Sequence, residues 1–147
     1  MSDKTHPAIL LFSEKHPLTS MLDLKFITDD SPDLRVEVDA PESFADEHGE
    51  HIHTGFHTLL LDTVLGSCAI GNLETMQPIA TMKLSCNHMR KVKIGEPLHC
   101  TARWSGEENS ISYVNGEIRR ISDDVVISEA IGTFMIGTTG RPLDEKA

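Results

Sequence analysis

The stretch "TGFHTLLLDTVLGSCAIGNL", residues 54–73, decides how this chain is expected to fold. It is apolar almost all round, which indicates a helix buried inside a domain rather than one lying on its surface. Asp62 is the only charged residue in the stretch. Thr54 suits a helix N-cap, and the glycine and asparagine at 71 and 72 suit the end of a helix.

Strands are predicted on both sides of this helix. Residues 22–38, "LDLKFITDDSPDLRVEV", contain two alternating runs around a turn, which predicts a hairpin. After the helix, four more alternating runs are separated by turn signals at hairpin length: residues 79–92, 96–106, 110–122 and 125–137. The expected order is a hairpin, one buried helix and an antiparallel meander of four strands.

The remaining segments are two chain ends and one loop. We expect a brief helix or turn in the N-terminal extension, about residues 1–20, because of its apolar cluster "AILLF". Residues 139–147 are expected to form a flexible tail. Residues 39–53 are polar, contain proline and glycine, and make an unusually long loop, of the kind that often carries function. With 147 residues, a single domain spanning 1–147 is expected.

Composition excludes several classes of partner. The chain has 13 basic and 23 acidic residues, a formal charge of −10, which disfavours nucleic acid and anionic membranes as partners. It has no apolar run of eighteen residues and no basic leader followed by an apolar segment, so a cytoplasmic location is expected. Cys68, Cys86 and Cys100 form an odd set without paired spacing, which indicates buried apolar side chains rather than disulfides or a zinc site.

A buried central helix within an antiparallel sheet is the α+β hotdog fold, and two motifs fit it. The helix entrance His53-Thr54-Gly55, followed by Asp62, resembles the signature of the phenylacetate-pathway and 4-hydroxybenzoyl-CoA thioesterase superfamily, His-Gly-Gly and then Asp nine residues after the His. Residues 81–98, "TMKLSCNHMRKVKIGEPL", resemble that superfamily's third strand and following turn. The resemblance covers about residues 20–138 and implies hydrolysis of acyl-CoA thioesters without a metal or redox cofactor.

Thioester hydrolysis needs a site for the negative charge that develops on the carbonyl oxygen, and a group that activates water. Free N–H groups at a helix N-terminus meet the first need, which assigns it to Thr54 and Gly55. Asp62 meets the second, as general base or as nucleophile. The resemblance also implies a helping hydroxyl from the next strand, at Thr81.

Distance along the helix makes a second copy necessary. Eight residues separate Thr54 from Asp62, about 12 Å at ~1.5 Å per residue, too far for both to act on one carbonyl. Two chains around a twofold axis can combine the entrance of one helix with the aspartate of the other. The resemblance implies this homodimer, and a pairing of two dimers is a further alternative.

Two departures from the superfamily pattern bear on the rate. Thr54 replaces the middle glycine, which keeps the N–H but adds a branched side chain near the thioester. Many relatives have an amide side chain about six residues before the histidine, where this chain has Glu47, which donates no hydrogen bond unless it is protonated. His53 is expected to fix the loop at the helix entrance. Basic residues are expected to meet coenzyme A phosphates or to protect a sheet edge: Lys83, Arg90, Lys91, Lys93, Arg119 and Arg120.

Three alternative readings stay open. A cupin-like metal site would use His51 and His53 with His48 or His57, although no glutamate follows at the required spacing. A hotdog enoyl-CoA hydratase would use Asp46 and His51, which are five residues apart. The third alternative is a non-catalytic acyl-CoA-binding hotdog protein.

Overall fold

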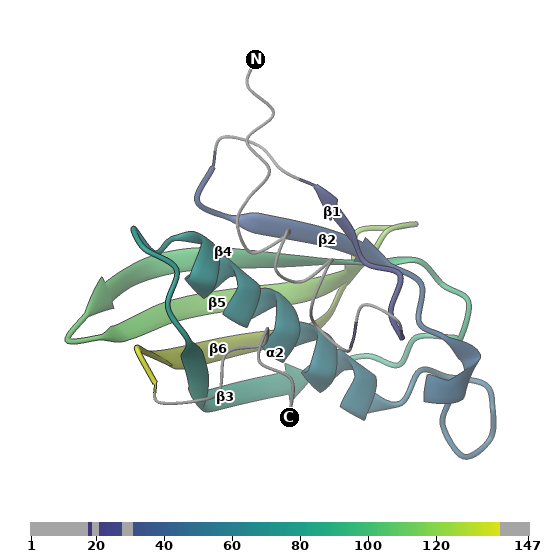
Figure 1. Cartoon of the computed structure of the whole chain (residues 1–147). Helices are drawn as coiled ribbons and strands as arrows, with labels where there is room; N and C mark the ends of the chain where they lie inside the picture. Colours follow the sequence, from purple (N-terminus) through teal and green to yellow (C-terminus); the bar gives the residue numbers. More distant parts are fainter. Residues whose placement is uncertain (1–17, 19–20, 28–30, 139–147) are drawn as a thin grey trace.

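We describe the protein from a computed structural model that covers residue 18, residues 21–27 and residues 31–138. The predictions for the chain ends, the cluster "AILLF" and the tail 139–147, lie outside the described residues. Within them the structure is one antiparallel sheet with one long helix packed on it (Figure 1). The six strands are β1 Lys25–Ile27, β2 Leu34–Val38, β3 Ile79–His88, β4 Leu98–Glu108, β5 Ile111–Arg120 and β6 Val126–Ile136.

The hotdog prediction is confirmed by this architecture. Helix α2, Thr54–Gly71, lies across the face of the sheet and is followed by the cap residue Asn72. A short 3-10 helix, η2 Glu42–Phe44, interrupts the loop before it. None of the helices in the described part of the chain is long and apolar enough to cross a bilayer.

The predicted four-strand meander was wrong in one pairing. The sheet order is β1-β2-β4-β5-β6-β3, so β4, β5 and β6 form a meander while β3 pairs with β6 at the far edge. The hairpin of β1 and β2 joins the other side of β4. The nine residues between β3 and β4 therefore cross the sheet instead of closing a hairpin, and they pass the entrance of α2 on the way.

The core lies between α2 and the inner face of the sheet. Strand residues alternate between buried and exposed positions, as expected for a sheet with one covered face. Many of the fully buried side chains come from the helix and the facing strands, among them Phe56, Leu60, Leu61, Val64 and Leu65 with Val36, Leu98, Cys100, Val114, Ile118 and Phe134. A Cβ on Gly116 would stand 2.6 Å from Leu65 Cδ1 and 2.7 Å from Thr101 O, so the helix approaches the sheet too closely there for a side chain.

Candidate active site

The helix entrance is capped by an imidazole. His53 precedes the helix with extended backbone angles, and its Nδ1 accepts a 2.9 Å hydrogen bond from the Gly55 N–H. The prediction that Thr54 is the N-cap was therefore wrong: Thr54 is the first helical residue. A ring nitrogen two residues before the donor takes the role that a hydroxyl or carboxylate oxygen usually has.

Because of this cap, the first backbone N–H groups of the helix are not equally available to a ligand. The Gly55 N–H is occupied by His53, and the Phe56 N–H donates to the His53 carbonyl at 2.9 Å. The Thr54 N–H has no partner among the described residues, and Thr54 and Gly55 are both exposed. Of the two amides expected to hold an oxyanion, that of Thr54 is open and that of Gly55 becomes available only when His53 turns away.

Asp62 and Thr81 meet across the space between α2 and the edge strand. The Thr81 hydroxyl donates a 2.8 Å hydrogen bond to Asp62 Oδ1. Asp62 is half-buried, two turns after the helix entrance, and Thr81 lies next to a bulge in β3. A carboxylate has acceptor sites beyond the one that a single hydroxyl occupies, so this aspartate can also accept a proton from a water molecule.

The loop before the helix is held by Asp46. Its Oδ1 accepts hydrogen bonds from the N–H groups of His48, Glu50 and His51 at 3.1–3.4 Å, and its Oδ2 lies 3.6 Å from His51 Nδ1. Burial opposes ionisation of Asp46, but the N–H groups of Glu50, His51 and His48 outweigh it and lower the pKa of the carboxyl. The structure thus brings Asp46 and His51 together, with the aspartate already committed to the loop backbone.

The same loop is tied to the crossing segment after β3. The Ile52 N–H donates to the Val92 carbonyl at 2.8 Å, and the Ile94 N–H donates to the Glu50 carbonyl at 3.0 Å. An isolated bridge pairs His51 with Lys93. Lys91 and Lys93 are exposed and alternate with buried Val92, so both ammonium groups lie on the outside of the segment that borders the helix entrance.

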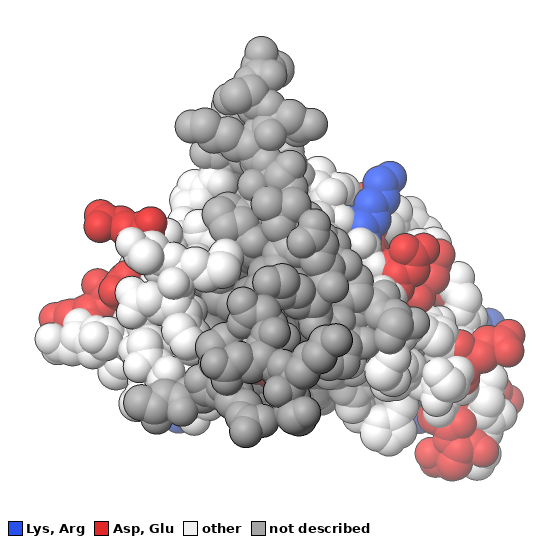
Figure 2. Space-filling view, viewed as in Figure 1, with Lys and Arg blue, Asp and Glu red and all other residues white. Residues whose placement is uncertain are grey.

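Other basic side chains are engaged in hydrogen bonds or ion pairs within the protein. Arg90 donates to the Val126 carbonyl at 2.6 Å, and Arg119 pairs with Val126 in the sheet register. Arg119 and Arg120 lie on β5, which β6 separates from β3, and their guanidinium groups bind Glu117, Asp123 and Asp124. Arg119 and Arg120 therefore do not lie on a strand next to β3. On the helix-bearing face, Figure 2 shows acidic side chains gathered at both ends of the molecule.

Glu47 lies at the exposed tip of the loop. Its side chain is 78 % exposed, and its Oε1 lies 3.7 Å from His48 Nε2. No contact within the described residues joins Glu47 to the helix entrance. Within the described residues, the side chain of Glu47 therefore has its neighbour on its own loop.

The histidines of residues 48–57 do not converge. His48 is exposed at the loop tip, His51 faces Asp46, His53 caps Gly55, and His57 is 1 % exposed. No group of three or more His, Cys, Asp or Glu side chains suited to a metal occurs among the described residues. The residues of the cupin-like alternative are therefore engaged separately.

Sequence reasoning missed a polar cluster beside the entrance. His88, on β3, bonds through Nδ1 to Ser128 Oγ at 2.8 Å and through Nε2 to Thr58 Oγ1 at 3.2 Å. The ring of His57 lies 6.0 Å from that of His88. Burial, and then the neighbouring His88, lower the pKa of His57 to about 4. A histidine at the end of β3 was the available signal, but its partners are 30 and 40 residues away.

The cysteines are free thiols, and Cys68 and Cys100 are buried as predicted, while Cys86 is half-buried. Burial raises the pKa of the Cys68 thiol to about 12 and also raises the pKa of Cys100. Burial and the nearby Asp62 raise the pKa of Cys86. A thiol with a raised pKa is a poor nucleophile near neutral pH.

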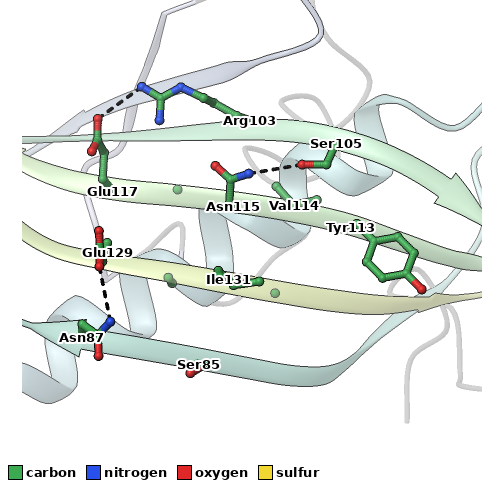
Figure 3. Close-up of a pocket in the computed structure, with 13 residues that line it drawn as sticks. Ser85, Asn87, Arg103, Ser105, Tyr113, Val114, Asn115, Glu117, Glu129 and Ile131 are labelled. Atoms are coloured by element: carbon green, nitrogen blue, oxygen red, sulfur yellow. Dashed lines mark hydrogen bonds and ion pairs between the residues drawn. The ribbon is translucent and has the colours of Figure 1, made fainter.

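A separate hollow of about 630 Å³ lies along β3–β6, lined by the outward side chains of these strands (Figure 3). Arg103 binds Glu117 at 3.2 Å, and Asn87 donates to Glu129 at 3.3 Å along its borders. Neither Thr54 nor Asp62 lines it. Because Tyr113, Asn115 and Glu117 alternate with the core residues of β5, the hollow lies on the sheet face opposite the helix.

Solved structures share this fold at low sequence identity. A thioesterase family protein from Silicibacter pomeroyi is 16 % identical with a TM-score of 0.77, over 88 % of this chain and 96 % of that one. The Escherichia coli PaaI protein of the phenylacetic acid degradation operon is 14 % identical with a TM-score of 0.77, over 89 % and 91 %. A Streptococcus mutans protein bound to acetyl-CoA is 15 % identical with a TM-score of 0.70, over 81 % and 92 %.

Sequence comparison gives the family. Among curated protein sequences no match is found. Residues 49–127, more than half of the chain, match the thioesterase superfamily. This region runs from the loop before α2 through β3, β4 and β5 and thus contains the helix entrance, Asp62 and Thr81. The chain belongs to the thioesterase superfamily.

Proposed function

We propose that this protein hydrolyses acyl-CoA thioesters to the free acid and coenzyme A, in a site shared by two copies of the chain. The observation that carries the proposal is the Asp62–Thr81 pair, a half-buried carboxylate oriented by a hydroxyl at an edge of the sheet. Asp62 takes a proton from water as the water oxygen attacks the thioester carbonyl. The C–S bond then breaks and the electron pair leaves with the thiolate of coenzyme A.

The second half of the site is the entrance of α2. The open Thr54 N–H, joined by the Gly55 N–H once His53 turns away, stabilises the oxyanion that forms on the carbonyl. Within one chain these amides lie about 12 Å along the helix from Asp62, at ~1.5 Å per residue. The amides that serve Asp62 therefore come from the partner subunit.

The free edge of β3 supports this pairing. β3 is the last strand of the described sheet, and it carries Thr81, so the carboxylate stands at the edge where another chain can add a strand. A twofold axis at this edge joins β3 to its own copy and forms two equivalent sites. Pairing of dimers into a tetramer remains a further proposal.

Coenzyme A phosphates are the proposed ligands of Arg90, Lys91 and Lys93. These residues lie on the segment that hydrogen-bonds to the loop before α2, close to the entrance where the thioester binds. In a chain of net charge −10, exposed cations beside that entrance provide a local attraction for an anionic substrate. The Streptococcus mutans protein of the same fold is described as bound to acetyl-CoA, which fits a ligand of this chemistry.

A non-catalytic acyl-CoA-binding protein is the second candidate. The occupied Gly55 N–H favours it, because an oxyanion would have to displace His53. The branched side chain of Thr54 and the position of Glu47 at the loop tip favour it too. Such a protein would keep the dimer and bind acyl-CoA without turnover.

Thiol release from a panel of short, medium, long and aromatic acyl-CoAs tests the proposal. Turnover by the wild type that is lost in Asp62→Asn supports the hydrolase, and binding without turnover supports the second candidate. Asp46→Asn serves as the matched variant on the loop. Hydration of enoyl-CoA that is sensitive to Asp46→Asn but not to Asp62→Asn would instead identify a hydratase.

A further inference from the structure

A column of polar side chains runs between α2 and β3. Thr54, Thr58 and Asp62 follow one another at four-residue spacing, so they share one face of the helix. Opposite them, β3 supplies Thr81 to Asp62 and His88 to Thr58. The Asp62–Thr81 contact of this column belongs to the proposed hydrolytic site. The Thr58–His88 contact lies outside the catalytic groups of that site.

The Thr58–His88 contact is part of a chain of hydrogen bonds in which each group donates to the next, from Ser128 through His88 and Thr58 to Thr54. The Thr58 hydroxyl donates to the Thr54 carbonyl at 3.4 Å, and it has only one hydrogen. With that hydrogen directed at the Thr54 carbonyl, the hydroxyl accepts from His88 Nε2, which lies 3.2 Å away. A neutral His88 with its hydrogen on Nε2 has an acceptor at Nδ1, and Ser128 Oγ lies 2.8 Å from that nitrogen. Ser128 is fully buried, so the far end of the chain is fixed inside the protein.

His88 is held more firmly than its position suggests. It lies at the end of an edge strand and is exposed as a residue. An exposed imidazole usually bonds to water, yet both ring nitrogens of His88 meet side chains of other elements. Contacts at both nitrogens thereby hold the orientation of the ring. The groups facing it from the packed elements are His57, Thr58 and Ser128.

The chain ends on the peptide group that carries one of the proposed oxyanion donors. The Thr54 carbonyl and the Gly55 N–H belong to the same peptide unit. A hydrogen bond accepted by the carbonyl polarises the unit and makes its N–H a stronger donor, as in other hydrogen-bond chains. In the structure that N–H donates to His53 at 2.9 Å, so the chain runs continuously from Ser128 to His53.

We propose that His88 is a positioning residue for thioester hydrolysis: with Ser128 behind it and Thr58 in front, it orients and polarises the Thr54–Gly55 peptide at the helix entrance. In this role His88 contacts neither the substrate nor the attacking water, and it acts through Thr58. The inference rests on the proposed function for its catalytic meaning, but the hydrogen-bond chain itself is measurable without any substrate.

Nuclear magnetic resonance of the full-length protein tests the chain directly. With ¹⁵N-labelled histidine, the ring hydrogen of His88 is expected on Nε2, facing the Thr58 hydroxyl. Thr58→Val keeps the branched shape of the side chain but removes the hydroxyl. This variant and His88→Phe, each made singly, should shift the Gly55 amide resonance in the same direction. His48→Gln, on the exposed loop, should leave that resonance unchanged. A hydrogen on Nδ1, or a Gly55 resonance that ignores both variants, would overturn the proposal.

A double-mutant cycle in turnover then tests the catalytic meaning. His88→Phe and Thr58→Val should each lower kcat about five- to tenfold, as expected for one lost hydrogen bond, with little change in KM. Because His88 acts through Thr58, the double variant should be no slower than either single variant. Additive losses, or a change confined to KM, would refute it. His88→Gln, which keeps a donor for Thr58, should recover part of kcat.

The two levels of failure are distinguishable. If the wild type hydrolyses no thioester, the proposed function fails. The resonance experiment still decides whether the chain of hydrogen bonds from Ser128 to Thr54 exists. If the wild type turns over and Asp62→Asn does not, yet the cycle is additive, the hydrolase stands and the role of His88 is wrong. Thermal denaturation of each variant, compared with the wild type, separates a loss of fold from a loss of rate.

Discussion

The Thr81 hydroxyl donates a 2.8 Å hydrogen bond to Asp62 Oδ1, although 19 positions of sequence separate the two residues. This bond fixes one carboxylate oxygen and leaves the other for water. Thr81→Val should therefore lower kcat by about tenfold, the loss expected when a hydrogen bond to a charged group is removed. Thr81→Ser should keep most of the rate. Equal losses in both variants would contradict an orienting role for the hydroxyl, and steady-state kinetics measures the difference.

Thr54→Pro tests the open amide at the helix entrance. Proline is favoured at the first helical position, and His53 already has the extended angles that a residue before proline needs, so the fold should be kept. Removal of one oxyanion donor should lower kcat by roughly a hundredfold or more. Thr54→Ser, which retains the N–H, is the control. A proline variant with normal turnover would show that this amide does not hold the oxyanion.

Mixing two inactive variants tests the shared site. Asp62→Asn and Thr54→Pro damage opposite halves, so a mixed dimer regains one intact site. After subunit exchange, about a quarter of wild-type activity should return, because half of randomly paired dimers carry one good site out of two. A mixture that stays inactive, although exchange is verified by mass spectrometry of tagged chains, would place both halves in one subunit.

The pKa of His57 predicts how stability depends on pH. Burial, and then His88, lower this pKa from 6.5 to about 4, so between these values the unfolded chain binds the proton more strongly than the folded chain. The free energy of unfolding should be unaffected by His57 above pH 6.5 and should fall as the pH drops toward 4, by at most about 3 kcal/mol.

His57→Phe isolates this contribution. It removes the titrating group and a buried Nδ1 that has no hydrogen-bond partner in the described part of the chain, while filling a similar space. Urea denaturation between pH 4 and 7 should show that the difference in stability between the variant and the wild type grows as the pH falls. Parallel curves would mean that His57 keeps an ordinary affinity for protons in the folded chain.

Gly116→Ala tests the close approach of the helix to the sheet. The added Cβ would meet Leu65 Cδ1 at 2.6 Å and Thr101 O at 2.7 Å, and the backbone oxygen cannot turn aside. A loss of about 2–3 kcal/mol is expected from this overpacking. Gly66→Ala is the matched control, because its Cβ finds Phe134 at an ordinary 3.4 Å and alanine favours helices. Equal effects in thermal denaturation would refute the packing argument.

Much of the fold was predictable because its signals are local. The apolar run of residues 54–73 predicted the start of α2 and placed its end two residues beyond Gly71. Alternating runs predicted each strand. The path of β3 was not predictable in the same way. A run of alternating residues does not name its neighbour, and the segment after His88 looks like a turn, although it carries the chain across to β4.

In the candidate site, too, local features were predictable from the sequence and tertiary contacts were not. Asp62 and the helix entrance were visible in sequence because one charge in an apolar helix and a cap-like motif are local features. The cap itself was assigned to the wrong residue, since the preference for hydroxyl side chains pointed to Thr54 rather than to His53. The bonds of His88 to Thr58 and Ser128 depend on tertiary neighbours and leave no pattern in sequence.

The most direct test of the central claim is the release of thiol from acyl-CoAs by the purified protein, with wild type, Asp62→Asn and Asp46→Asn measured side by side. We predict that the wild type turns over at least one acyl class, that Asp62→Asn lowers its kcat by roughly a hundredfold or more, and that Asp46→Asn retains turnover. Hydrolysis that survives in Asp62→Asn, or acyl-CoA binding without any hydrolysis by the wild type, would contradict it.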